Sequence, residues 1–305
     1  DIVPSNFFES ASDNGNMLQV VFVALFLGVV LLLLPGEKSE PLLAVFDSLF
    51  EAIIKAVEVI MLTAPVGVFG LLADAITSIA AESPADLASL LGALGFYCLT
   101  VVIGLAIMVF VVYPIFMRLF TSFSIPDYFR AIAPAQLVAF STSSSGATLP
   151  VTMEVSEKNL GVSEQVSSFV LPLGATVNMD GTALYQAVSA VFIAQVLGIS
   201  LAFTQQLNIV LIAVLASIGT AAVPSAGIVM LVVILESIGV PSAGLALILG
   251  VDRPLDMLRT TNNVTGDTMV ASVVAATENQ LNFPTNGVSV ATTDVQGGVR
   301  EETAR

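Results

Sequence analysis

Apolar residues fill long stretches of the chain, and polar or glycine-rich breaks divide these stretches into helices of two kinds. The first kind is long and uninterrupted, over about 17–34, 41–72 and 88–117. About 20 apolar residues allow a helix to cross the core of a bilayer. These three stretches are therefore predicted to be membrane-spanning helices.

The second of these helices also carries a polar stripe. Asp47, Glu51, Lys55 and Glu58 recur every three or four residues, so they share one helical face. That face is expected to contact a partner helix, lipid headgroups or water rather than lipid tails.

After Arg130 the apolar stretches become shorter and are joined by tips rich in serine and glycine. Residues 131–163 contain one tip, Ser141–Gly146, and residues 207–240 contain another, between Ser217 and Gly227. Irregular backbone at membrane depth is tolerated only where protein buries it or where it lines a cavity. Both segments are therefore predicted to be re-entrant helical hairpins rather than crossings.

A helix with polar residues in its middle follows each hairpin. One, over about 165–198, is interrupted at Asn178–Thr182, and the other covers about 243–277. Paired, interrupted short segments in two halves of a membrane protein indicate an inverted repeat and a transporter binding site. Glycines that merely allow close helix packing would not account for two matched tips, each followed by a charged helix.

Composition supports a membrane protein and excludes several kinds of site. Of the 305 residues, 56% are apolar and 11% are charged, whereas soluble domains carry about 25% charged residues. The fold class expected is an all-α polytopic membrane protein. With no histidine and one cysteine, Cys98, the chain offers no His-based triad, haem site or zinc cluster, and no cofactor is expected. The net charge of -15 argues against nucleic acid as a partner.

The positive charges indicate an orientation. Lys38, Arg118, Arg130 and Lys158 lie in the loops of one side, and the loops near 81–86 and 200–206 have no Lys or Arg. Positive loops are typically cytoplasmic. The first hairpin is then expected to open from the cytoplasm and the second from outside. Residues 279–305 are predicted to form a disordered cytoplasmic tail.

The last helix carries the strongest chemical signal. At about 100° per residue, its polar side chains fall within an arc of roughly 80°. These are Asp252, Asp256, Arg259, Asn263 and Asp267. Ionisable residues inside a membrane are costly and usually functional. A structural ladder, with Arg259 paired to Asp256, is the alternative, but it leaves Asp180 and Asp267 without a basic partner.

Carboxylates without a basic partner need a proton or a cation. Asp180 stands beside Asn178 and Thr182 at a helix break, where carboxylate, amide and carbonyl oxygens make a shell suited to an alkali cation. Asp267 offers a second such shell. The guanidinium of Arg259 suits bidentate capture of a carboxylate, and helix N-termini at the hairpin tips can hold another anionic group. The pattern favours a molecule with two carboxylates that moves together with cations.

Three segments together resemble the dicarboxylate/amino acid:cation symporters, which include archaeal aspartate transporters and excitatory amino acid (glutamate) transporters. They are Asn178–Thr182, the tip Ser141–Gly146 with Thr148–Pro150, and Asp256–Asp267. The resemblance implies a glutamate-transporter-like fold, with a partial scaffold and trimerisation domain over 1–80 and a transport domain over 87–278. It further implies a homotrimer in the plasma (cell inner) membrane. This trimer would carry aspartate or glutamate by Na⁺ symport through an elevator motion, and the protein would not be an enzyme.

The resemblance also assigns residues by matching motif. Substrate would be held by Ser143, Ser145, Thr182, Val223, Gly227, Asp256, Arg259, Thr260 and Asn263. Arg259 would meet the side-chain carboxylate of the substrate, Asp256 its amino group and Asn263 its main-chain carboxylate. Na⁺ would be held by Gly174, Asn178, Asn263 and Asp267 at one site; by Thr176, Met179, Ser217, Ile218 and Thr220 at a second; and by Asn178 and Asp180 at a third.

The chain departs from the family pattern in three ways. The family has eight spanning helices, and the first two or three have no counterpart here, so we expect an N-terminal truncation that removes part of the third Na⁺ site. Ser143 and Met257 stand where members often have arginine, and Arg253 is a candidate substitute. Gln186 replaces a glutamate of proton- and K⁺-coupled animal members, which argues against such coupling at this position.

Other classes of protein fit less well. An intramembrane aspartyl protease could use Asp180 and Asp267, but the sequence around them differs from that of such enzymes, and the two hairpins would have no role. An ion channel could also use polar tips. Within the family, a C4-dicarboxylate or a neutral amino acid is the alternative substrate.

Overall fold

The computed structural model describes residues 3–12, 17–63, 66, 70, 84–218 and 220–282, and the regular structure of these residues is helical apart from one isolated bridge. The predicted all-α class is confirmed. The helices of the first half are α1 (Phe7–Ala11), α2 (Met17–Leu33), α3 (Gly36–Met61), α5 (Pro84–Ile107), the π-turn η2 (Met108–Val112) and α6 (Tyr113–Phe120). Those of the second half are α7 (Ile125–Thr142), α8 (Ser145–Lys158), α9 (Glu164–Val177), α10 (Asp180–Val196), α11 (Phe203–Ile218), α12 (Ala226–Ser237), the short η3 (Ser242–Leu245) and α13 (Ala246–Thr277).

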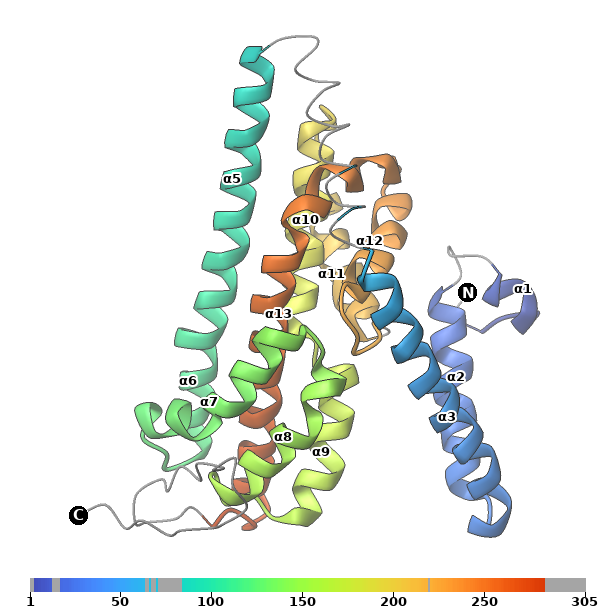
Figure 1. The fold of residues 1–305 in the computed structure, drawn as a ribbon, viewed down its shortest axis with the longest axis vertical. Coiled ribbons are helices and arrows are strands. Elements are labelled where there is room, and N and C mark those ends of the chain that lie inside the picture. Colours follow the sequence, from blue (N-terminus) through green and yellow to red (C-terminus); the bar gives the residue numbers. More distant parts are fainter. Residues whose placement is uncertain are drawn as a thin grey trace.

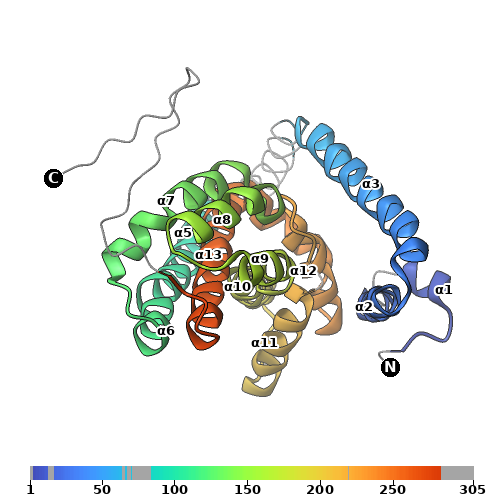
Figure 2. The same cartoon turned by 90° about the horizontal axis from the view of Figure 1, so that it is seen from below.

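Helices α1, α2 and α3 stand to one side of the remaining helices in both views (Figures 1 and 2). Helix α2 lies where a helix was predicted over 17–34. Helix α3 begins at Gly36, ahead of the predicted start at Pro41, so this proline lies inside the helix. Proline lacks the N–H that would bond the preceding turn, so a proline in the sequence indicates a helix start, whereas α3 continues through Pro41. Most of 62–83, which ends the predicted second helix and the 1–80 domain, lies outside the described residues.

Helices α5, η2 and α6 follow one another without a gap and form the long rod at the edge of Figure 1. Among the described helices, Ala88–Phe120 is long and apolar enough to cross a membrane, and only 17% of its most apolar window is buried inside the protein. The π-turn widens one turn of this rod immediately before Tyr113. Turns of this kind are often found at functional sites.

Two helical hairpins are present where the tips were predicted. Helices α7 and α8 meet at Ser143, whose positive φ of 55° ends α7, and Ser144 caps α8 by accepting a hydrogen bond from the Ala147 N–H (3.1 Å). Helix α7 starts at Ile125 rather than 131, because the charged turn with the Arg130–Asp127 ion pair (2.9 Å) is also helical. In the second hairpin, α11 and α12 are joined by a tip whose last residue, Ser225, has φ 58°.

The predicted helix break lies between α9 and α10. Asn178 (φ -89°, ψ 63°) and Met179 (φ -104°, ψ 53°) leave the helical region, and Asp180 begins the next helix. The Asn178 N–H still donates to the Gly174 carbonyl (2.8 Å), and the Met179 carbonyl accepts from the Ala183 N–H (2.9 Å), so the two helices end and begin directly at the break. The break lies at Asn178 and Met179, directly before the Asp180 carboxylate, where the sequence pattern predicted it.

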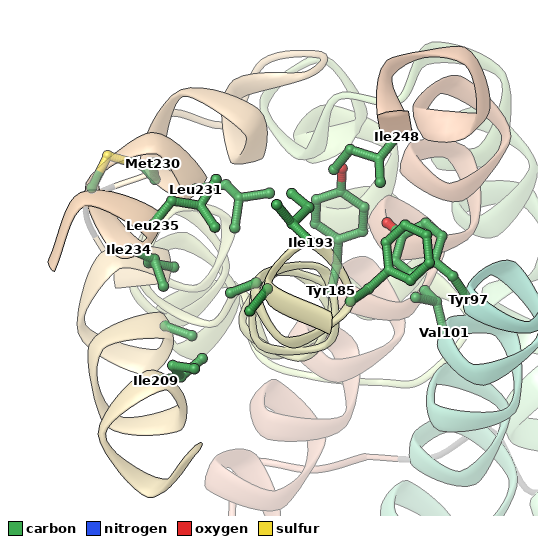
Figure 3. Packing of buried hydrophobic residues seen from close by; sticks show 14 of the residues in the cluster. Tyr97, Val101, Tyr185, Ile193, Ile209, Met230, Leu231, Ile234, Leu235 and Ile248 are labelled. Carbon is green, nitrogen blue, oxygen red and sulfur yellow. The ribbon is translucent and has the colours of Figure 1, made fainter. Parts of the chain in front are cut away.

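Helix α13 runs through the middle of the bundle (Figures 1 and 2) and contacts α5, α6, α7, α8, α9 and α10. Hairpin 1, the α7–α8 pair, packs on α13 and α9, whereas the arms of hairpin 2, the α11–α12 pair, pack mainly on α10. Figure 3 shows the hydrophobic core between hairpin 2, α10 and α5. In it, Tyr185 and Ile193 of α10 have Leu231 and Leu235 of hairpin 2 on one side and Tyr97 of α5 on the other. Hairpin 2 is therefore joined to α13 mainly by its tip.

The described residues that follow α13 contact the loop between α8 and α9. Leu281 pairs with Val162 in the isolated bridge, and the Ser163 N–H donates to the Gln280 carbonyl (3.1 Å). The predicted tail 279–305 is thus docked on the loop between α8 and α9 at its start. Residues 283–305 lie outside the described part.

Candidate functional site

A small polar cavity lies where the two hairpin tips, the break between α9 and α10, and the centre of α13 meet. Its volume is only about 20 Å³, which is room for about one water molecule. All nine residues predicted to hold substrate line it, together with four others. The lining residues are Ser143, Ser145, Met179, Thr182, Thr220, Ala221, Ala222, Val223, Gly227, Asp256, Arg259, Thr260 and Asn263.

Arg259 is the charged centre of this cavity, with only 2% of its surface exposed. It donates from Nη2 to Asp256 Oδ1, and its Nη1 lies 3.9 Å from Asp252 Oδ1. The guanidinium carbon lies 4.3 Å from the centre of the Tyr185 ring, a cation–π contact. The pairing of Arg259 with Asp256 that the structural alternative required is therefore present. However, Nη1 has no hydrogen-bond partner among the described residues.

The tip of hairpin 2 is held down by the same carboxylates. The Ser225 N–H donates to Asp256 Oδ2 (2.8 Å), and its hydroxyl donates to Asp252 Oδ2 (3.2 Å). Asp252 also accepts a hydrogen bond from the Tyr185 hydroxyl (2.7 Å). Asp252 and Asp256 thus balance the charge of Arg259, and the same two carboxylates fasten the tip of hairpin 2 to α13.

The two tips also touch each other across the cavity. The Ser144 hydroxyl donates to the Ala222 carbonyl (2.7 Å), and the Gly146 N–H donates to the same oxygen (3.2 Å). These contacts close the cavity between the hairpins.

The remaining wall is formed by neutral polar groups. The Asn263 side chain donates to the Thr182 hydroxyl (3.1 Å) and accepts from the Gly181 N–H (2.9 Å). The Ser143 hydroxyl is buried and has no hydrogen-bond partner within the described residues. Buried polar groups are normally paired, so Ser143 Oγ and Arg259 Nη1 are groups that a polar ligand would satisfy.

Asp267 lies below the cavity in the first predicted cation site. Its Oδ1 accepts a hydrogen bond from the Asn178 side chain (2.9 Å). A Cβ atom on Gly174 would lie 2.8 Å from the same oxygen, so only glycine allows α9 to approach α13 this closely. The structure thus brings Gly174, Asn178 and Asp267 together, and Asn263 lies one turn away on α13.

The hydroxyls of the second predicted cation site bond within their own segments. Thr176 is exposed and donates to the Leu173 carbonyl (3.0 Å). Ser217 donates to Val214 (2.9 Å) and Thr220 to Ala216 (3.0 Å). Of the other members, Met179 lines the cavity and Ile218 ends α11. Helices α9 and α11 are in contact, and Thr220 lines the cavity together with Met179.

Asp180 accepts hydrogen bonds from residues that the sequence reasoning did not assign. The Tyr113 hydroxyl donates to Oδ2, and Oδ1 accepts from the Asn262 side chain (3.1 Å) and from the Gly181 N–H (2.8 Å). Its predicted partner Asn178 bonds Asp267 instead.

Comparison with known proteins shows to which family the chain that carries this site belongs. The chain matches the sodium:dicarboxylate symporter family over residues 1–277. It is a member of that family. Family members are transporters rather than enzymes, so the site is not an aspartyl protease centre, and this symporter-family chain is a multi-pass membrane protein.

Relatives of this symporter-family chain come from animals and bacteria. It is 44% identical to human excitatory amino acid transporter 1 over 238 residues, 78% of the chain and 43% of that protein. It is 41% identical to an excitatory amino acid transporter of Caenorhabditis elegans over 259 residues, 85% of the chain and 50% of the relative. It is 38% identical to the proton/sodium-glutamate symport protein of Bacillus subtilis (strain 168) over 282 residues, 92% and 63% of the two chains. The chain thus spans between about two fifths and two thirds of these relatives.

Two residues outside the motifs can be placed against the sodium:dicarboxylate symporter pattern. Arg253, the candidate substitute for a tip arginine, is exposed and does not line the cavity. Gln186 is fully buried and donates to the Gly227 carbonyl (3.1 Å) at the start of α12. Gln186 therefore ties α10 to hairpin 2 as a neutral side chain.

Proposed function

We propose that this symporter-family protein is a secondary active transporter that moves acidic amino acids together with Na⁺. The observation that carries the proposal is the convergence of all nine predicted substrate residues on one cavity around a buried arginine. The names of the relatives, which include excitatory amino acid transporters and a sodium-glutamate symport protein, support it.

An acidic amino acid would match the groups around the cavity one by one. Arg259 would pair with the side-chain carboxylate, since Nη1 is buried and lacks a hydrogen-bond partner among the described groups. Asp256 would take the ammonium group. Asn263 and the Ser143 hydroxyl would hold the main-chain carboxylate. Asp256 would favour a substrate with an amino group over a plain C4-dicarboxylate.

The cavity must open for such a substrate, because about 20 Å³ holds no amino acid. Hairpin 2 is the segment suited to open it, since its arms pack on α10 while its tip reaches α13 through Ser225. In this proposal both hairpins are re-entrant, hairpin 1 opens from the cytoplasm, and the C-terminus is cytoplasmic. Residues 87–278 would move as the transport domain of a homotrimer in the plasma membrane, against a scaffold that includes α2 and α3.

Na⁺ would balance the carboxylates that have no basic partner. Asp267, Asn178 and the Gly174 carbonyl would provide one site with Asn263, and Asp180 would contribute to another. The remaining site would form once the C-terminal ends of α9 and α11 turn toward each other. Its members would be Thr176, Met179, Ser217, Ile218 and Thr220. Binding of cations next to the cavity would couple their movement to that of substrate.

Uptake into proteoliposomes tests this function. The complete protein is reconstituted, and labelled aspartate, glutamate, succinate and serine are offered with and without an inward Na⁺ gradient. We expect concentrative uptake of aspartate or glutamate that needs the gradient. Downhill flux without concentration would indicate a channel, and preferred uptake of succinate or serine would contradict the assignment of substrate.

A further inference from the structure

Asp180 is the carboxylate of the site whose oxygens are most fully occupied by hydrogen-bond donors of the protein. Tyr113, Asn262 and the Gly181 N–H all donate to it. Asp267, by contrast, accepts one side-chain hydrogen bond among the described residues, from Asn178. An incoming cation finds free acceptor positions on Asp267, but it meets competing donors on Asp180.

Tyr113 is placed for this contact by the structure around it. It is 1% exposed, and it follows the π-turn that shifts the register of the long rod. A Cβ atom on Gly266 would come within 3.0 Å of the Tyr113 hydroxyl, so a larger residue there would push the phenol away. The hydroxyl also accepts from the Asn262 side chain (2.8 Å), which polarises it and strengthens its own donation to Asp180.

We propose that Tyr113 sets the cation affinity at Asp180 by competing with the cation for the carboxylate, and that Asn262 supports it. This inference rests on the proposed Na⁺-coupled transport. A cation that binds Asp180 must displace the phenol from Oδ2, so the hydrogen bond raises the cation concentration needed to fill the site. Tyr113 is a positioning residue: it touches neither the cavity nor the substrate groups.

The test is a Na⁺ titration of aspartate uptake by the complete protein with Tyr113→Phe, which removes the hydroxyl and keeps the ring. We expect the half-saturating Na⁺ concentration to fall by roughly tenfold to 100-fold, the change that corresponds to loss of one hydrogen bond to a charged group. At saturating Na⁺, the KM for aspartate should stay within about twofold. An unchanged or higher half-saturating Na⁺ concentration overturns the inference.

Tyr128→Phe is the matched control. This second buried tyrosine contacts the same helix α13, but it donates to the Thr265 carbonyl (2.8 Å) and lies 2.8 Å from the Thr268 hydroxyl, with no carboxylate contact among the described residues. It should leave the Na⁺ titration unchanged. If Tyr113→Phe and Tyr128→Phe shift the half-saturating Na⁺ concentration equally, the shift is caused by altered packing on α13, and the inference is wrong.

A double variant tests whether the effect of Tyr113→Phe on the Na⁺ titration acts through Asp180. Tyr113→Phe combined with Asp180→Asn should titrate like Asp180→Asn alone, and a further shift in the double variant contradicts competition at this carboxylate. If Tyr113→Phe does not fold, Asn262→Val removes a donor to Asp180 and to the phenol, and it should lower half-saturating Na⁺ in the same direction. Wild-type uptake without Na⁺ dependence would instead overturn the proposed function.

Discussion

Arg259 is buried and its charge is balanced, yet its Nη1 has no hydrogen-bond partner among the described residues. Its charge is balanced by Asp256 and Asp252, and its plane lies against Tyr185. Removing one partner of a buried ion pair costs about 3–5 kcal/mol, because the other charge is left uncompensated. The remaining Nη1 group of this otherwise paired guanidinium marks where a substrate carboxylate would add to the network.

Arg259→Cys is expected to lower aspartate uptake by the complete protein by roughly 100-fold or more, since a buried charge-assisted pair is lost. Serine should become a substrate, because Asp256 and Asn263 remain for its ammonium and carboxylate groups. Initial rates of labelled uptake measure both effects, and thermal unfolding shows whether the variant is folded. Arg253→Cys, an exposed arginine on the same helix, is the control and should transport normally. Undiminished aspartate uptake by Arg259→Cys would refute the role of this arginine.

For single residues, the sequence predicted which side chains share one face of a helix. It did not predict which residues of different helices contact each other. The period of α13 alone placed Asp252, Asp256 and Arg259 on one buried face. Tyr113 and Tyr185 lie in apolar runs, where an aromatic ring normally indicates core packing. Their hydroxyls donate hydrogen bonds to carboxylates on other helices, Tyr113 to Asp180 and Tyr185 to Asp252. Which residues pair in this way depends on how the helices pack. Ser225 was missed for the same reason.

Among the elements, the two hairpins are attached differently. Hairpin 1 packs along α13 and α9, and the Tyr128 hydroxyl ties α7 to the Thr265 carbonyl of α13. Hairpin 2 packs on α10 and reaches α13 through hydrogen bonds from Ser225. Small and polar residues at the tips predicted where both hairpins turn. The starts of α3 and α7 were predicted too late, because Pro41 and the charged turn before Arg130 read as breaks although a helix tolerates both there.

Gly174→Ala is expected to weaken the approach of α9 to α13. The added methyl would lie 2.8 Å from Asp267 Oδ1, so the carboxylate and its bond to Asn178 must shift. Half-saturating Na⁺ in aspartate uptake should rise by about tenfold, and the melting temperature should fall. Gly95→Ala on α5, where a methyl meets no described atom within 4 Å, should change neither. A Na⁺ titration of Gly174→Ala that matches wild type would remove Gly174 and Asp267 from the cation site.

For the whole molecule, the decisive feature is that elements distant in sequence close one small cavity. Hairpin 1, the helix break, hairpin 2 and α13 each contribute lining residues. The sequence motifs predicted which segments line the cavity, since each segment carries its own signal, but they did not point to Ala221 and Ala222. They could not predict that the cavity is shut, because closure depends on contacts between the tips, such as Ser144 with Ala222. In the transport that we propose, a shut cavity requires the tips to separate before substrate can enter.

A reversible cross-link between the tips tests that requirement. A Cβ atom on Gly146 would lie 3.5 Å from the Ala222 Cβ, within the range of about 3.5–4.5 Å found in disulfides. We expect Gly146→Cys with Ala222→Cys, in a Cys98→Ala background, to lose Na⁺-driven aspartate uptake on oxidation and to regain it on reduction. Either cysteine alone should be insensitive to oxidant, so loss of uptake in the single variants would point to another cause. Full uptake by the cross-linked protein, with the disulfide verified by mass spectrometry, would show that substrate reaches the cavity without separating these tips.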